Sequence, residues 1–167
     1  TCSGGTGPSH MDRTREHIPV LYDKVLAGLQ VRAGGQYVDA TVGAGGHAAG
    51  ILEASAPDGR LLGMDADEEA TSFARLVLRP FGDRVILQAE NFRHLQKVAQ
   101  ASGFSQVDGV LLDLGISSRQ LADANRGFSF SQNGPLDRRL ASGQATSASD
   151  LVNSLSEGDL ADLVWQY

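Results

Sequence analysis

Short apolar runs alternate with helical patterns between residues 36 and 115 of this chain. Four of the runs are almost continuously apolar, as in strands buried on both faces, and the segments between them repeat apolar residues at helical spacing. The predicted strands are residues 37–41, 60–65, 85–90 and 107–115. Strands that alternate with helices of this length favour parallel strands in an α/β layer sheet.

Turn and stop signals bound the predicted helices. The Pro-Asp-Gly sequence at 57–59 and Pro80 each end a helical pattern, and Gly34-Gly35 separates the first helix from the first strand. The predicted helices are residues 23–29, 48–56, 67–78 and 94–101. One helix therefore joins each pair of successive strands, as parallel pairing requires.

The pattern changes after residue 115. Residues 116–146 are polar, and a loop of this length inside a compact domain is usually functional or disordered. The side chains in it that favour a function are two phenylalanines and four arginines: Phe128, Phe130, Arg119, Arg126, Arg138 and Arg139. Two short helices are then predicted to begin at Ser149 and Ser156, a residue type that caps helices well.

Composition narrows the class of protein. The 167 residues, 41% of them hydrophobic, fit one domain with a sizeable core, and no apolar run approaches the roughly 18–20 residues of a membrane span. The formal net charge of −6 argues against a generally basic surface, so nucleic acid would have to contact a local patch. The single cysteine, Cys2, provides neither a disulfide nor a thiolate metal site, which favours a reducing compartment. We expect a cytoplasmic protein without a metal centre.

The first 15 residues differ in character from the rest of the chain. They lack the charged and then apolar pattern of a signal peptide. We expect residues 1–15 to be a tag remnant or a disordered leader.

A glycine turn, residues 39–47, lies between the first predicted strand and the helix that follows it. Its glycines allow positive φ and lack the Cβ that blocks the approach of a ligand, and the helix N-terminus offers unpaired N–H groups. Gly43-x-Gly45-x-x-Ala48 matches the dinucleotide-binding fingerprint only in part. A tight turn without any ligand would use the same glycines, so the turn alone leaves both interpretations open.

Three further residues lie at or just beyond the carboxyl ends of predicted strands, where ligands bind in an open parallel sheet. Asp65 comes about twenty residues after the glycines, where an acid can accept both ribose hydroxyls. Phe92 offers a flat surface for an adenine ring, and Asp113 lies beside the first strand, where a reacting group would lie. The plain alternatives are a helix cap for each acid and a core side chain for Phe92.

Two cofactors suit such a crevice. NAD would need room for a pyrophosphate, a second mononucleotide half and a proton donor, yet no lysine or histidine closely follows the fourth strand. S-adenosyl-L-methionine needs a turn for its aminoacyl tail, an acid for the ribose, a platform for adenine and a polar strand end near its methyl group. All four are present, so the residues favour methyl transfer, with an NAD-dependent oxidoreductase as the alternative.

Several longer motifs resemble those of one family. Residues 41–47 (TVGAGGH), 113–118 (DLGISS), 126–130 (RGFSF) and 134–137 (GPLD) occur in the order found in the MraW family of bacterial small-subunit ribosomal RNA cytosine-N4 methyltransferases. The resemblance runs from residue 17 to residue 167. Among the departures, Arg138 stands where the family tends to have Met.

The resemblance implies a function, a fold and a set of site residues. The function is methyl transfer from S-adenosyl-L-methionine to the N4 atom of a cytosine in the RNA of the small ribosomal subunit. The fold is a Rossmann-like class I methyltransferase sheet with strand order 3-2-1-4, spanning an α/β domain at 16–118, with a substrate loop and the beginning of a helical insert at 119–167. The implied cofactor contacts are Gly45, Gly46, His47, Asp65, Phe92, Asp113 and Gln120.

Asp113 is the candidate catalytic residue, because its carboxylate can accept a hydrogen bond from the poorly nucleophilic amine of cytosine. The base must leave its stack, and Phe128 or Phe130 would then stack on it while the four loop arginines contact phosphates. His47 is predicted to begin a helix, where a cation is disfavoured, so we expect it to bind the cofactor as a neutral imidazole.

Family members continue well past residue 167, so the chain resembles about half of a full enzyme. An inactive fragment that binds the cofactor or RNA is therefore a second alternative. The fourth strand would then be an exposed apolar edge, which predicts a homodimer or poor solubility.

Overall fold

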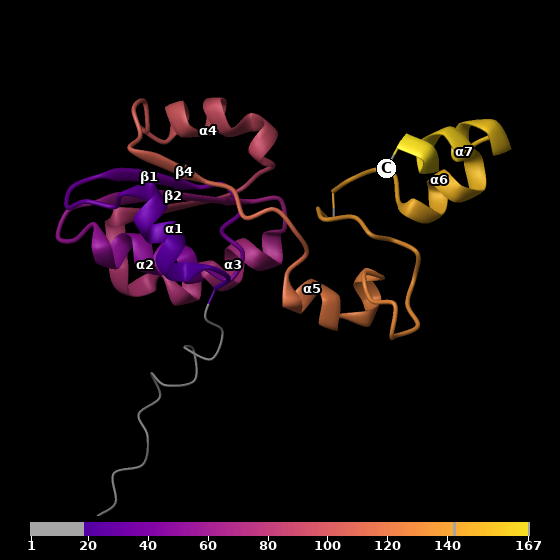
Figure 1. Ribbon diagram of the computed structural model, residues 1–167, viewed down its shortest axis with the longest axis horizontal. Coiled ribbons are helices and arrows are strands. Elements are labelled where there is room, and N and C mark those ends of the chain that lie inside the picture. Colours follow the sequence, from indigo (N-terminus) through magenta and orange to yellow (C-terminus); the bar gives the residue numbers. More distant parts are fainter. Residues whose placement is uncertain (1–18, 142, 167) are drawn as a thin grey trace, which may run out of the picture. The chain divides into compact units, whose positions relative to one another are not determined.

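The computed structural model describes residues 19–141 and 143–166, which form two compact units (Figure 1). The first unit holds the described residues up to Asp65 together with Glu69–Asp113, and the second holds Ala66–Glu68 and the described residues from Leu114 onward. The predicted leader at 1–15 lies outside the described residues. In the part of the chain that the structure covers, no helix is long and apolar enough to cross a membrane.

The first unit is built on a four-stranded parallel sheet. Its strands are β1 (Gln36–Asp39), β2 (Arg60–Asp65), β3 (Val85–Ala89) and β4 (Gly109–Leu111). They lie in the order β3-β2-β1-β4, which confirms the predicted α/β class and the predicted order. β4 is shorter than the predicted strand, because β1 pairs with it over three residues only, Tyr37–Asp39.

Helices cover both faces of this sheet (Figure 1). α1 (Tyr22–Leu29), α2 (Gly46–Ala54) and α3 (Glu68–Val77) lie on one face, and α4 (Leu95–Ala101) lies on the other. Two short 3₁₀ helices, η2 (Arg79–Arg84) and η3 (Phe92–His94), stand before and after β3.

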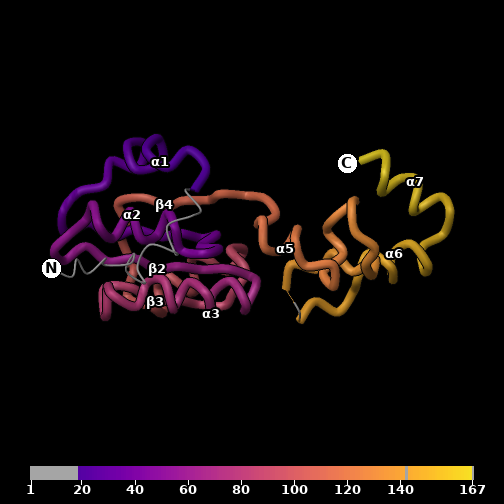
Figure 2. Tube along the Cα trace, turned by 90° about the horizontal axis from the view of Figure 1, so that it is seen from below, coloured from indigo at the N-terminus to yellow at the C-terminus, as the bar shows by residue number. Residues whose placement is uncertain are grey.

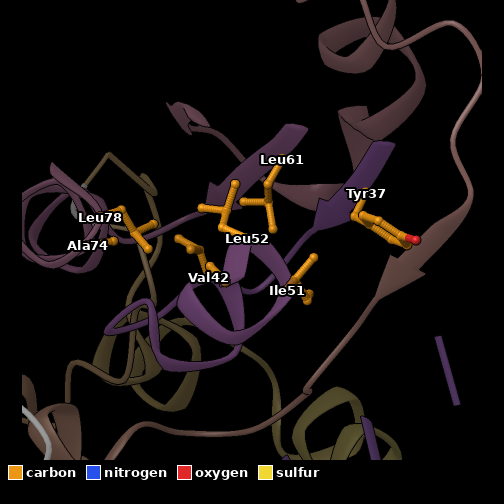
Figure 3. Packing of buried hydrophobic residues seen from close by; sticks show 8 residues of the cluster. Tyr37, Val42, Ile51, Leu52, Leu61, Ala74 and Leu78 are labelled. Carbon is orange, nitrogen blue, oxygen red and sulfur yellow. The ribbon is translucent and has the colours of Figure 1, made fainter. Parts of the chain in front are cut away.

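Successive residues of β1 and β2 enter two different layers of the core. Tyr37 and Leu61 pack with the residues of α2 and α3 shown in Figure 3. Val38 and Leu62 pack on the opposite face with Ala99 of α4. Because the central positions of both strands are covered on either face, their apolar residues are consecutive rather than alternating.

The second unit contains short helices joined by a long loop. They are α5 (Ser118–Ala122), the 3₁₀ helix η4 (Ala124–Arg126), α6 (Ala148–Ser154) and α7 (Glu157–Gln166). The trace in Figure 2 folds back on itself between η4 and α6, where the Arg138 N–H donates to Arg126 O at 3.3 Å. The cap of α6 is Ser147 in a capping box with Asp150, not Ser149 as predicted.

Candidate active site

Acidic residues follow three neighbouring strands at one edge of the sheet. Asp39 ends β1, Asp65 ends β2, and Asp113 comes two residues after β4. The parallel register pairs Asp39 with Gly63 of β2 and with Leu111 of β4, so the three strands end side by side. Ligands of open parallel sheets bind beyond this edge.

The glycine turn is hydrogen-bonded to residues on both sides of β1. The Gly43 N–H donates to Asp65 Oδ2 at 3.0 Å. On the other side, the Asp113 N–H donates to Thr41 Oγ1 at 2.7 Å. The turn is therefore held between the two acids that the sequence predicted as site residues.

The glycines of the turn are required for different structural reasons. Gly43 and Gly45 have φ values of +50° and +86°, in the left-handed region that favours glycine. A Cβ built on Gly43 would meet Thr41 O, at 3.8 Å, as its one close neighbour among the described residues, so this side of the turn is open to a ligand. A Cβ on Gly46 would lie 2.5 Å from Pro19 Cγ, so Gly46 is needed for packing whether or not a ligand binds.

His47 is buried next to the turn. Its side chain is 8% exposed, and its ring stacks on that of Tyr22 with centroids 6.2 Å apart. Nε2 lies 3.6 Å from Asp113 Oδ2, too far for a hydrogen bond, and neither ring nitrogen has a hydrogen-bond partner among the described residues. Burial lowers the pKa of His47 and the Asp113 charge opposes this, so the imidazole is neutral at neutral pH.

Buried polar atoms in proteins are normally hydrogen-bonded. The two ring nitrogens of His47 therefore fit a site that takes a polar ligand. The open side of Gly43 and the carboxylates of Asp65 and Asp113 suit a ligand that also carries positive charge.

Asp39 was not among the predicted site residues, although it follows the same rule as Asp65 and Asp113. It is fully buried, and burial raises the pKa of its carboxyl to about 7. The Thr41 N–H, which donates to Asp39 Oδ1 at 3.2 Å, opposes that rise, and the charges of Asp65 and Asp113 add to it. The signal in the sequence was an acid at the start of the glycine turn, although the predicted strand 37–41 ran past it.

Phe92 begins η3 directly after β3, the strand beside β2. Asn91 caps this turn by accepting the Arg93 N–H at 2.9 Å, and Glu90 pairs with His94 at 3.1 Å. Phe92 is 44% exposed, so the alternative that it is a core side chain is wrong. Its ring is available at the same edge of the sheet as Asp65.

Comparison with known proteins assigns the chain to a family. The model of the MraW methylase family matches residues 14–167. The chain belongs to the MraW methylase family. It is 52% identical over 151 residues to the ribosomal RNA small subunit methyltransferase H of Geotalea uraniireducens (strain Rf4), covering 90% of this chain and 48% of that protein. The corresponding protein of Syntrophobacter fumaroxidans is also 52% identical over 151 residues, with coverage of 90% and 47%.

This MraW family chain thus spans about half the length of the curated relatives it matches. Among solved structures, Aeropyrum pernix fibrillarin in complex with S-adenosyl-L-methionine is 20% identical, with a TM-score of 0.47 and coverage of 62% of this chain and 46% of that one.

Gln120, which the MraW resemblance implied as a cofactor contact, belongs to the second unit. Its Oε1 accepts the Ser117 N–H at 3.0 Å in the capping box of α5, and its Nε2 donates to Asp67 Oδ2 at 2.9 Å. Asp67 also forms an ion pair with Arg126 at 3.0 Å. Asp67, the first residue of the predicted helix 67–78, therefore holds α5 and η4 together.

The structure corrects the predicted RNA contacts of the MraW loop. Phe128 is 4% exposed, so the prediction that it stacks on a base is wrong. Arg126 is held by Asp67 and by the carbonyl of Leu140, and Arg139 makes a two-point ion pair with Asp137. Both arginines therefore stabilise the loop from within.

Proposed function

We propose that this chain binds S-adenosyl-L-methionine and belongs to an enzyme that methylates N4 of a cytosine in the RNA of the small ribosomal subunit. The main support is the glycine turn, which is hydrogen-bonded to Asp65 on one side and to Asp113 on the other. The names of the matched relatives and the family membership agree with this function. A ribosomal RNA substrate would make the protein cytoplasmic.

The predicted contacts fit the parts of this cofactor. Gly45, Gly46 and His47 would hold the aminoacyl tail at the N-terminus of α2, which no side chain caps and where a helix favours anionic groups. Asp65 would accept the ribose hydroxyls, and Phe92 would stack on adenine. Gln120 stays a predicted contact. When bound, the cofactor supplies an electrophilic methyl group on a cationic sulfur.

Asp113 has the exposure that a catalytic acceptor needs. Its side chain is 53% exposed, while its backbone is fixed by the hydrogen bond to Thr41. The carboxylate would accept a hydrogen bond from the N4 amine. This hydrogen bond localises the nitrogen lone pair, and the carboxylate can then accept the proton that the nitrogen loses on methylation. Holding the amine in line with the methyl group supplies much of the rate.

The test combines cofactor titration with methyl transfer to small ribosomal subunits. We expect Asp113→Ala to lower methyl transfer by at least about 100-fold, in the range of lost acid–base catalysis, while calorimetry shows cofactor affinity weakened only moderately. Asp83→Ala is the matched control, because Asp83 is exposed in η2, before β3, and not at the carboxyl edge of the sheet.

Each alternative has its own outcome in these measurements. Unchanged transfer by Asp113→Ala contradicts the proposed role of Asp113. Cofactor binding without transfer by the unaltered chain favours a binding fragment. Binding of NADH, but not of S-adenosyl-L-methionine, in a spectroscopic titration favours the oxidoreductase.

A further inference from the structure

The loop between η4 and α6 is folded tightly by two glycines. Gly127 has φ +66°, and a Cβ on it would lie 1.8 Å from Pro135 O. A Cβ on Gly134 would lie 2.1 Å from Ala124 O. The two segments therefore cross in direct backbone contact, and the residues beyond each glycine are brought together.

Arg138 and Phe130 meet on the outside of this loop. The Arg138 guanidinium lies 5.9 Å from the ring centre of the buried Phe128 and 5.6 Å from that of Phe130. These distances are within the range of cation–π contacts. Within the described residues the guanidinium of Arg138 makes no hydrogen bond or ion pair, in contrast to those of Arg126 and Arg139.

Phe130 is the most exposed phenylalanine of the described chain, at 95%. Apart from the Arg138 guanidinium beside it, the Phe130 ring is open, so a planar group can stack on it. Arg138 has φ +59°, a strained conformation for a residue other than glycine. The loop thus places an arginine with a strained backbone next to an aromatic ring that does not pack into the described core.

We propose that Phe130 and Arg138 form a platform on which one unpaired base of an RNA strand stacks. Single-stranded RNA is recognised by stacking of splayed bases on aromatic rings and guanidinium planes. Arg138 adds the positive charge that attracts the phosphate beside that base. This inference rests on the proposed function, because the RNA substrate is part of that proposal. The inference adds the residues that bind the RNA.

The test measures binding of a short fluorescein-labelled single-stranded oligoribonucleotide to the whole chain by fluorescence anisotropy. Phe130→Ala is expected to weaken binding between about 5-fold and about 150-fold, the range for one lost base–aromatic stack. Phe130→Trp should restore it, because any large aromatic ring can stack. A duplex of the same sequence should bind more weakly than the single strand.

The dependence of RNA affinity on salt concentration distinguishes the contribution of charge from that of stacking. Arg138→Met should reduce the slope of log affinity against log salt by about 0.7, the value for one phosphate contact on a single strand, whereas Phe130→Ala should leave that slope unchanged. Arg79→Met is the matched control, because Arg79 is exposed at the start of η2 in the first unit and should not change the affinity.

The platform is overturned if the unaltered chain does not bind the single strand, or if Phe130→Ala binds it equally well. Preference for the duplex also overturns it. Calorimetry with S-adenosyl-L-methionine keeps this failure distinct from failure of the proposed function. If the chain binds the cofactor but Phe130 does not contribute to RNA binding, only the platform is contradicted. If the chain binds no cofactor, the proposed function is contradicted.

Discussion

At the scale of single residues, Asp39 shows how a buried acid links folding to pH. Burial raises the pKa of Asp39 from 3.8 to about 7, so the folded chain holds this proton more tightly than the unfolded chain does. The cost of ionising it is absent below about pH 4 and fully present above about pH 7. At 1.36 kcal/mol per pKa unit, that cost is roughly 4 kcal/mol.

We therefore predict that Asp39→Asn removes this cost while the side-chain oxygen still accepts the Thr41 N–H. The free energy of unfolding of the variant, relative to the unaltered chain, should rise between about pH 4 and about pH 7 by up to roughly 4 kcal/mol. Chemical denaturation of both proteins across this range measures it. For Asp83→Asn, the difference in unfolding free energy from the unaltered chain should not change with pH. The same pH-independence for Asp39→Asn would contradict the cost of ionising the buried carboxyl.

At the scale of elements, α1 and α2 pack through a glycine. A Cβ on Gly50 of α2 would lie 2.2 Å from the hydroxyl oxygen of Tyr22, the first residue of α1, whereas a Cβ on Gly28 of α1 would meet no atom within 4 Å. Tyr22 in turn stacks on His47. The absence of a side chain at Gly50 therefore lets α1 approach and position the ring beside His47.

Two otherwise identical substitutions in these helices are predicted to have opposite effects. Gly28→Ala should stabilise the chain by about 0.5–1 kcal/mol, because alanine loses less backbone entropy in a helix. Gly50→Ala should destabilise it by about 1–3 kcal/mol, the usual result of overpacking. Thermal unfolding of both variants measures the pair, and a stabilising Gly50→Ala would show that Tyr22 can move away without loss.

The elements of the first unit could be predicted from the sequence because their signals are local. β2 has the predicted bounds, and helix ends at Pro80 and at residues 57–59 follow turn chemistry. The ends of β1 and β4 were harder to predict, because they depend on the partner strand. In the loop after β4, the fold is set by contacts such as Asp67 with Arg126, 59 residues apart in the numbering, which no local pattern reveals.

At the scale of the whole molecule, site residues could be placed once the topology was known. The rule that ligands bind beyond the carboxyl ends of parallel strands located Asp65, Phe92 and Asp113 at one edge. It did not distinguish Arg126, which pairs internally, from Arg138, which does not, because that depends on three-dimensional contacts. The same limit applied to Phe128 and Phe130, whose exposure differs although their sequence context is shared.

The outer side of β4 is the part of the sheet that we expect to govern self-association. Among the described strands β4 pairs only with β1, and Leu112, just after it, is 48% exposed. Apolar strand edges associate unless a charge protects them. We predict that the chain forms dimers or larger species in light scattering and that Leu112→Lys shifts it toward the monomer.

The control for this prediction is Leu76→Lys, which adds the same charge at an exposed leucine of α3, away from the strand edge. It should leave the mass distribution unchanged. A monodisperse monomer of the unaltered chain would contradict association through β4.

The charges of Asp65 and Asp113 at the end of the sheet have a consequence for turnover. Under the proposed function, donating the methyl group turns a cationic sulfonium into a neutral thioether, so the spent cofactor carries one positive charge fewer than the fresh one. The carboxylates of Asp65 and Asp113 attract the fresh cofactor more strongly for that reason. Methyl transfer thus weakens the electrostatic attraction between the site and the spent cofactor, and this favours its replacement by fresh cofactor.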